Sequence, residues 1–379
     1  MEDIERYRSE FPITERFAFM NHAAVSPLPV RAVKAVEDLF QEFSCSGIEC
    51  YPNWERRIHE VRKMFARLIN ADAGEIAFIG STSEGLSAVA TGLEWKNGDI
   101  VLIPEIDFPA NIYPWMNLER HGVTTRFIPK KDGRFEVRDV EKVLSPRTRL
   151  VSVSSVDFAT GFRYDLEALG GFCREKGLLF CVDAIQSLGA IPLDVKKYGI
   201  HFLSAGGHKW LLSTMGCGCL YIARAVNHII HPERVGWKSV VDEEDFFRVH
   251  FHLKPDALRF EPGTMNVAGI YCLGAAIELI LEVGIQSVHR HILAVNDILF
   301  RGLRDRSIKI VTSMEEKERS GILSFVPPSD SAGLWKYLND NRIMVSLRDG
   351  KIRLSPHFYN NNEDAELFLR TLDGFYGSK

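Results

Sequence analysis

The chain of 379 residues has no long hydrophobic run and no strong excess of charge. No segment offers the roughly eighteen uninterrupted apolar residues that a membrane-spanning helix needs. The formal net charge is −4, and the 46 lysines and arginines are scattered along the chain. The sequence therefore lacks the basic patch that binding to nucleic acid or to an anionic membrane would require, and we expect neither as a partner.

Two further features are scarce, an apolar leader and regularly spaced cysteines. The first seventeen residues are rich in charge and lack the apolar core of a secretory signal, so we expect a cytoplasmic protein. The seven cysteines are irregularly spaced, as is typical of buried thiols in a reducing compartment. Only one residue separates Cys217 from Cys219, and no second ligand pair accompanies them. We interpret both as strand cysteines and expect no metal site.

Between residues 75 and 222, the chain alternates short β-rich runs with longer amphipathic runs. This alternation predicts an α/β fold with a mainly parallel, seven-stranded sheet covered by helices. One of these helices, Leu166–Lys176, ends at Gly177. Long helices at 270–282 and 286–305 begin a smaller α+β domain. We place the large domain at residues 21–265 and the small domain at 1–20 and 266–379. The strands are predicted at 75–79, 99–103, 124–128, 150–156, 178–182, 201–203 and 218–222.

A lysine, Lys209, lies in the glycine-rich turn that begins at Ala205, and Asp183 ends an apolar run earlier in the chain. A lysine can hold the aldehyde of pyridoxal phosphate as a Schiff base, and an aspartate can keep the pyridine nitrogen protonated. Gln186 could hydrogen-bond the ring hydroxyl. Taken singly, Lys209 could be a surface charge and Asp183 a helix N-cap. Together they favour a pyridoxal phosphate enzyme.

A candidate phosphate site lies where the first predicted strand runs into Ser81, Thr82 and Ser83. Free backbone N–H groups at a helix start attract an anion, although an ordinary N-cap explains the same residues. The segment has neither a dinucleotide nor a nucleoside triphosphate signature, so a single phosphate fits better. Phe108 follows the next strand, where it could stack on a planar ring or simply join the core.

Four motifs occur in an order that resembles the class V aminotransferase family, which includes cysteine desulfurases, isopenicillin N epimerase and kynureninase. The resemblance extends from Asn21 to beyond Arg353. It implies the fold of a fold-type I PLP-dependent transferase, with pyridoxal 5'-phosphate as the cofactor. The motifs are Phe78-Ile79-Gly80-Ser81-Thr82-Ser83-Glu84-Gly85, Val182-Asp183-Ala184-Ile185-Gln186-Ser187, Gly207-His208-Lys209-Trp210 and Glu261-Pro262-Gly263-Thr264.

The resemblance also implies a role for each matching position. Lys209 would form the Schiff base and then move the proton at the substrate α-carbon, while Asp183 would pair with the pyridinium. A small amino-acid substrate would bind through Arg353, His22 and Ala23, with Arg353 clamping its carboxylate. The chain would form a homodimer in which Thr264 reaches the cofactor of the other subunit. The further cofactor contacts would be Thr82, Ser83, Phe108, Gln186 and His208.

Three positions depart from the pattern of cysteine desulfurases. Phe108 stands where many of them have a histidine over the ring, and Gly206 replaces a phosphate-contacting serine. No cysteine follows Cys272, so the usual persulfide-forming nucleophile is missing, although a direct β-elimination would not need it. We therefore expect an aminotransferase- or epimerase-like enzyme. The alternatives are a desulfurase-like carbon–sulfur lyase and a non-catalytic protein that binds pyridoxal phosphate.

Overall fold

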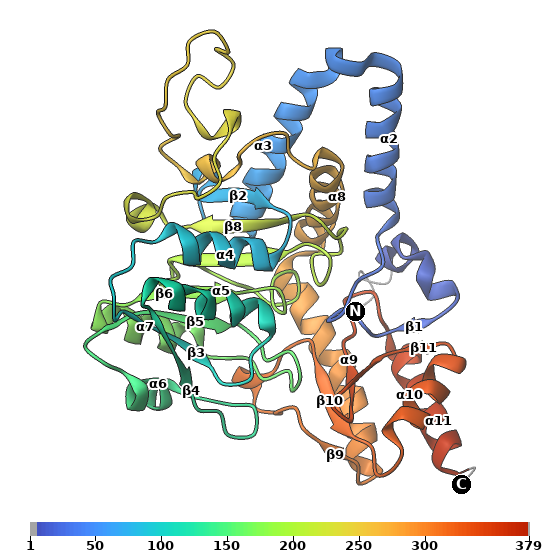
Figure 1. Cartoon of the computed structure of the whole chain (residues 1–379). Coiled ribbons are helices and arrows are strands. Elements are labelled where there is room, and N and C mark those ends of the chain that lie inside the picture. Colours follow the sequence, from blue (N-terminus) through green and yellow to red (C-terminus); the bar gives the residue numbers. More distant parts are fainter. Residues whose placement is uncertain (1–5, 378–379) are drawn as a thin grey trace.

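The computed structural model describes residues 6–377, and its largest element is a seven-stranded sheet (Figure 1). The spatial order is β2-β8-β7-β6-β5-β3-β4, and β8 runs antiparallel to both of its neighbours. The remaining neighbours pair in parallel, so the predicted mainly parallel sheet is confirmed. Its strands are β2 (Ile76–Ile79), β3 (Ile100–Pro104), β4 (Thr124–Ile128), β5 (Thr148–Ser154), β6 (Leu179–Asp183), β7 (Phe202–Gly206) and β8 (Gly218–Ile222).

Both faces of this sheet are covered, because successive side chains of a strand point to opposite faces. In β2, Ile76 and Phe78 enter one hydrophobic cluster, while Ala77 and Ile79 enter another. The connecting helices supply the cover, and α7 ends as predicted where Gly177 adopts a left-handed φ of 66°. These helices are α4 (Thr82–Gly92), α5 (Tyr113–Met116), α6 (Val137–Val143) and α7 (Leu166–Lys176).

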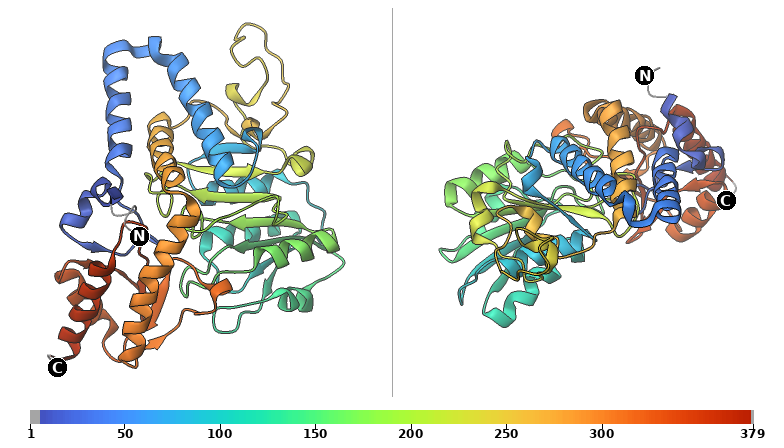
Figure 2. Two further views of the ribbon diagram at one scale, coloured as in Figure 1. Left: turned by 180° about the vertical axis from the view of Figure 1, so that it is seen from behind. Right: turned by 90° about the horizontal axis from the view of Figure 1, so that it is seen from above.

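Four long helices lie beside the sheet, and two of them form a projecting hairpin (Figure 2). The hairpin consists of α2 (Val30–Ser46) and α3 (Tyr51–Leu68), and both helices pack against α8 (Val267–Val283). Helix α9 (Ile285–Asp305) then runs into the smaller part of the molecule. Within residues 6–377, no single helix has both the length and the apolar composition of a membrane span. Helices α8 and α9, bent by 79° at their junction, meet that test only as a pair.

The smaller part is an α+β unit with its own hydrophobic cluster. A four-stranded antiparallel sheet of order β12-β13-β10-β9 lies with α10 and α11, and β1 (Ala18–Phe19) pairs in parallel with β11. The elements are β9 (Lys309–Ile310), β10 (Leu323–Val326), α10 (Ser331–Asp340), β11 (Ile343–Met344), β12 (Ser346–Arg348), β13 (Lys351–Leu354) and α11 (Asn362–Gly377).

The two hydrophobic cores meet inside α9. The boundary between the units therefore lies later in the chain than the one predicted between residues 265 and 266. Val288 and Ile292 belong to the cluster under the large sheet, whereas Val295 and Leu299 belong to the cluster of the small unit. Helix α8 packs with the large unit. Its apolar residues lie on all sides of the helix instead of forming one stripe, so the helix is buried all round. Sequence periodicity identified both helices but not the core that each one joins.

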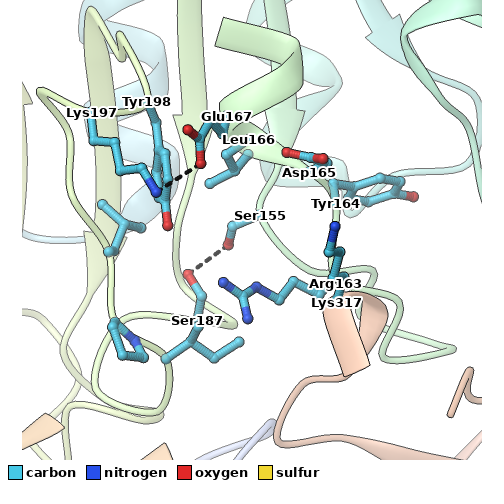
Figure 3. A pocket seen from close by; sticks show the side chains of 13 residues that line it. Ser155, Arg163, Tyr164, Asp165, Leu166, Glu167, Ser187, Lys197, Tyr198 and Lys317 are labelled. Atoms are coloured by element: carbon cyan, nitrogen blue, oxygen red, sulfur yellow. Dashed lines mark hydrogen bonds and ion pairs between the residues drawn. The ribbon is translucent and has the colours of Figure 1, made fainter. Parts of the chain in front are cut away.

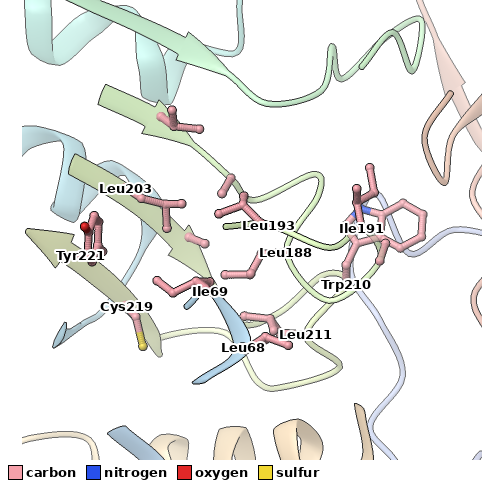
Figure 4. Close-up of a cluster of buried hydrophobic side chains, with 14 of the residues drawn as sticks. Leu68, Ile69, Leu188, Ile191, Leu193, Leu203, Trp210, Leu211, Cys219 and Tyr221 are labelled. Atoms are coloured by element: carbon pink, nitrogen blue, oxygen red, sulfur yellow. The ribbon is translucent and has the colours of Figure 1, made fainter. Parts of the chain in front are cut away.

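A dense part of the main cluster includes Trp210 and Leu211, the two residues after Lys209 (Figure 4). Trp210 and Leu211, which follow Lys209, are buried with Leu188 and Ile191 from the segment after Asp183. Close packing leaves such side chains little freedom to move. The turn that carries Lys209 is therefore held against the segment that carries Asp183.

A buried ion pair joins α3 to the segment before α8. Arg62 and Glu261 form two contacts, Nη1 to Oε1 at 2.6 Å and Nη2 to Oε2 at 3.0 Å, and both side chains are about 95% buried. The same carboxylate accepts the backbone N–H of Phe78 in β2 at 2.7 Å. Glu261 thus anchors the start of the Pro262-Gly263-Thr264 segment to α3 and β2.

Replacing Glu261 with glutamine should lower the free energy of unfolding by roughly 3–5 kcal/mol, because Arg62 would be left buried without a countercharge. Thermal and denaturant unfolding would measure the change. Asp38→Asn is the matched control, since the Lys34–Asp38 pair is exposed and should hardly affect unfolding. Equal effects of the two substitutions would contradict a structural role for the buried pair.

Candidate active site

One cavity of about 490 Å³ brings together most of the residues predicted for the site. It lies beyond the carboxyl ends of β3, β5 and β6, where ligands bind in doubly wound sheets. Seven further residues line it, and among them Phe158 and Arg348, which were not predicted for the site, carry the arguments below. The predicted residues that line the cavity are Ala23, Thr82, Ser83, Phe108, Asp183, Gln186, His208, Lys209 and Arg353.

Lys209 lies in the turn between β7 and β8 and is 8% exposed. Ser26 holds this turn, since its backbone N–H donates to the carbonyl of His208 at 2.9 Å and its hydroxyl donates to that of Lys209. Burial, with Arg353 and Arg348, lowers the pKa of Lys209 to about 8, although Asp183 opposes the shift. About a tenth of the amine is therefore neutral, and nucleophilic, at pH 7.

Asp183 ends β6 and is 2% exposed. Its carboxylate accepts the backbone N–H of Ile185 at 2.9 Å. Burial first, and then Asp107, raise the pKa of Asp183 to about 7, while the Ile185 N–H and Lys209 oppose the rise. A cation placed against this carboxylate would stabilise its ionised form, which is what a protonated pyridine nitrogen offers.

The amide of Gln186 is held in one orientation by two other segments. The indole N–H of Trp210 donates to its Oε1 at 3.0 Å, and its Nε2 donates to the carbonyl of Ala23 at 3.1 Å. One N–H of this buried amide remains for a ligand in the cavity. The role of Trp210 was missed from the sequence, although it directly follows Lys209.

The residues predicted to bind phosphate lie at the start of α4, at the wall of the cavity. Ser81 is the N-cap of α4, since the Ser81 hydroxyl accepts the N–H of Glu84 at 3.1 Å. Ser81 therefore has the ordinary capping role, and other backbone N–H groups of the first turn remain available to an anion. Thr82 is buried and its Oγ1 accepts the N–H of Gly206 at 2.9 Å. A Cβ on Gly206 would lie 3.1 Å from the His208 ring and 3.4 Å from Thr82 Oγ1. Glycine at position 206, where cysteine desulfurases have a serine, therefore lets the turn that carries Lys209 lie close to the start of α4.

Phe108 presents an exposed ring to the cavity. Its neighbour Asp107 is buried and accepts hydrogen bonds from Asn111, from Ser154 and from the N–H of Phe108, which anchors the loop. The Phe108 ring is 42% exposed, lies 5.4 Å from Lys209 Nζ and meets Phe158 edge to face. This placement favours stacking on a planar ligand over the alternative of a core side chain.

Arg353, in β13, is 2% exposed and has no carboxylate within ion-pair distance among residues 6–377. Its Nη1 donates to the carbonyl of Phe158 at 2.7 Å, and its buried Nε lacks a hydrogen-bond partner. Burial and Arg348 lower the pKa of Arg353 to about 9. An incoming carboxylate would supply the missing acceptor and countercharge.

Two predicted residues lie outside the cavity lining. His22 is fully buried, its Nδ1 donates to the carbonyl of Ser355 at 2.8 Å, and its Nε2 accepts from the hydroxyl of Tyr359 at 2.7 Å. With both ring nitrogens engaged, His22 supports Ala23 instead of binding substrate, which corrects the prediction. Thr264 is exposed, and its contact with a second subunit stays a prediction.

Uptake of pyridoxal phosphate by the apoprotein should rise with pH around a midpoint near 8, because the neutral amine of Lys209 is the reacting form. Arg353→Gln removes a neighbouring positive charge and should raise the midpoint, whereas Asp183→Asn should lower it. Stopped-flow absorbance would follow the reaction, with Lys209→Ala as the blank. A midpoint near the ordinary lysine value of 10.5 would contradict the proposed environment.

Comparisons with known proteins agree with this geometry. The family model for class V aminotransferases matches residues 18–368. Probable cysteine desulfurases of Pyrococcus abyssi and Methanothermobacter thermautotrophicus are 30% and 29% identical over 97% and 98% of this chain, and over 96% and 98% of their own lengths.

Two solved structures are similar over nearly their whole lengths. The apo cysteine desulfurase of Thermococcus onnurineus NA1 has a TM-score of 0.89 and 27% identity, covering 99% of this chain and 98% of that one. The cystine C-S lyase C-DES, in complex with its reaction product cysteine persulfide, has a TM-score of 0.89 and 25% identity, covering 96% and 99%. The chain therefore belongs to the class V aminotransferase family, a family of fold-type I pyridoxal phosphate enzymes.

Proposed function

We propose that the protein is a pyridoxal phosphate-dependent carbon–sulfur lyase that acts on cystine or a closely related amino acid. The observation that carries the proposal is the convergence of Lys209, Asp183 and Arg353 on a cavity that Arg348 also lines but no cysteine does. Relatives named cysteine desulfurase and cystine C-S lyase support this alternative over the aminotransferase- or epimerase-like activity expected from the sequence.

The residues of the cavity fit pyridoxal phosphate. When bound, the cofactor supplies an electron-withdrawing ring that stabilises negative charge at the substrate α-carbon. Asp183 would hold the ring nitrogen in its protonated form, and Gln186 would donate to the ring oxygen. The N–H groups at the start of α4, with Thr82 and Ser83, would hold the phosphate.

Arg353 binds the α-carboxylate of the substrate in this proposal. Its guanidinium is buried, lacks a countercharge and keeps donors free, so an amino acid would correct a charge imbalance that already exists. Arg348 is exposed at the edge of the same cavity and forms no ion pair among the described residues. A second carboxylate, such as the distal one of cystine, would reach it.

Lys209 carries the proton in this reaction. Its neutral amine accepts the proton from the substrate α-carbon, the electrons of that C–H bond form a double bond to the β-carbon, and the β-carbon–sulfur pair leaves with the sulfur. The Lys209 ammonium can then protonate the leaving group, so that no second acid is required. Hydrolysis of the three-carbon fragment yields pyruvate and ammonia, and the other product from cystine is cysteine persulfide.

The sulfur leaves on a small molecule in this proposal because no cysteine is placed to receive it. Among the described residues, Cys173, Cys181, Cys217, Cys219 and Cys272 are buried, while Cys45 and Cys50 belong to the projecting hairpin and its connection. Burial raises the pKa of Cys217 to about 12, so this thiol stays protonated and unreactive.

The holoprotein should convert L-cystine into equal amounts of pyruvate and ammonia with release of a persulfide, and Lys209→Ala should abolish the conversion. Coupled lactate dehydrogenase and cyanolysis assays would measure the products. The double variant Cys45→Ser/Cys50→Ser should keep full activity, because neither thiol lies near the cavity. Amino-group transfer from alanine, or D-amino acid formation without pyruvate, would instead establish one of the other activities.

Arg348→Gln provides a sharper control within the same assay. It should raise the KM for cystine by roughly tenfold and leave that for β-chloroalanine, which has one carboxylate, nearly unchanged. Equal effects on the two substrates would contradict recognition of a distal carboxylate.

We also propose that the protein is a homodimer. The segment from Asp242 to His252 exposes several large apolar side chains, among them Phe247 at 97% and Val249 at 99%. Lys238, four residues before this segment, donates its N–H to the carbonyl of Pro262 at 3.3 Å, next to Gly263 and Thr264. Apolar groups exposed together in this way are typical of a protein interface.

Sedimentation velocity should show a dimer that Phe247→Asp shifts toward monomer, because a charge would then lie in the apolar contact. The same variant should retain less pyridoxal phosphate if Thr264 completes the site of the other subunit. Leu367→Asp, on the distant helix α11, is the control and should leave the dimer intact. A monomeric wild type that keeps its cofactor would overturn the proposal.

A further inference from the structure

Figure 3 shows a second cavity, of about 300 Å³, which reaches the segment directly after Asp183 and Gln186. Asp183, Ile185 and Gln186 line the active cavity, whereas Ser187 lines the second one together with Ser155. The lining also includes the start of α7, the segment from Ile191 to Tyr198 and Lys317 of the small unit. One short stretch of chain therefore separates the two cavities.

Arg163 is the group in this cavity that the proposed catalysis does not use. Figure 3 shows its guanidinium pointing into the cavity near Ser155 and Ser187. Its side chain forms no hydrogen bond or ion pair within residues 6–377. Glu318, whose carbonyl accepts the N–H of Arg163 at 2.8 Å, directs its carboxylate to Arg134 at 3.2 Å and to Ser313. The charge of Arg163 is thus left without a countercharge.

The acidic residues of the lining are already engaged. Asp165 accepts the N–H of Ala168 at 2.9 Å as the N-cap of α7, and Glu167 pairs with Lys197 at 2.8 Å. Lys317 adds a further exposed cation with no ion pair in the part of the chain that the structure describes. Asp165 keeps its negative charge, but the two unpaired cations, Arg163 and Lys317, outnumber it and leave the lining with a net positive charge.

The remaining walls are apolar. Leu166, Ile191 and Leu193 are buried, and Pro192 completes this surface. The hydroxyls of Ser155 and Ser187 share a hydrogen bond of 2.7 Å at the base. A phosphate or sulfate ion would pair with Arg163 but would leave the apolar walls in contact with water. An uncharged apolar molecule would cover the walls but would leave Arg163 unpaired. A ligand with both characters satisfies the whole surface.

We propose that this cavity binds a small organic anion, a carboxylate carried on an apolar body. The carboxylate accepts two hydrogen bonds from the guanidinium of Arg163, and the body packs on Ile191 and Leu193. Such a ligand contacts the catalytic machinery only through the protein, because the N–H of Ser155 donates to the carbonyl of Asp183 at 2.8 Å. The site is separate from the substrate site and does not depend on the proposed lyase activity.

Calorimetry and ligand-observed NMR with phenylacetate, applied to the holoprotein, test this site. Phenylacetate should bind saturably, phenylacetamide should not, and Arg163→Gln should weaken phenylacetate binding by roughly tenfold to a hundredfold. Arg163→Lys keeps the charge and should restore part of the affinity, which separates charge recognition from misfolding. Lys196→Gln, one residue outside the lining, is the matched control and should bind like the wild type.

The active cavity could also take a carboxylate, so Arg353→Gln is measured in parallel. Binding that survives Arg353→Gln and is lost in Arg163→Gln supports the second site. Binding lost in Arg353→Gln and kept in Arg163→Gln would assign phenylacetate to the active cavity and overturn the proposal. Equal binding of phenylacetamide, or no saturable binding at all, would overturn it as well.

Discussion

The charges around Lys209 do not balance, and the organisation of the active cavity follows from that imbalance. Lys209 and Arg353 are buried beside one buried carboxylate, Asp183, and the exposed Arg348 adds a third positive charge at the edge of the cavity. Ions removed from water must find partners or change their protonation state. The protein meets this constraint by lowering the pKa of the lysine and by keeping anion sites ready for a phosphate and a carboxylate. The same imbalance favours binding and prepares the amine for chemistry.

The positions of these charges depend on contacts between segments far apart in the chain. Trp210 orients Gln186, Gln186 holds the backbone of Ala23, and His22 fixes that backbone from the buried side. Each contact uses a polar atom that would otherwise be buried without a partner. The hydrogen bonds that satisfy these buried polar atoms therefore also hold the residues of the cavity in place.

The sequence predicted the parts of the fold that are encoded locally. Strand runs such as Leu179–Asp183 are short and apolar, and the cap at Gly177 has a specific residue requirement, so both could be identified without coordinates. Lys209, Asp183 and the helix start at Thr82 could be grouped because the family motifs keep their order. The roles of Phe158, Trp210 and Arg348 could not be found, since they arise from distances across the fold. His22 was assigned to substrate together with its motif neighbour Ala23, but only Ala23 lines the cavity, whereas the ring of His22 turns inward.

Helix α9 belongs to both hydrophobic cores, and this continuity has a mechanical consequence. Lys209 is fixed in the large unit, whereas Arg353 extends from the small unit to the carbonyl of Phe158. The distance between the base and the carboxylate-binding arginine is thus set across a junction that an unbroken helix spans. Because long helices curve only gently, α9 holds the two units in a fixed relation, and in the proposed reaction this keeps the α-hydrogen facing Lys209 while Arg353 holds the α-carboxylate. The alignment of the α-hydrogen with the base is then a property of the scaffold as much as of the residues that touch the substrate.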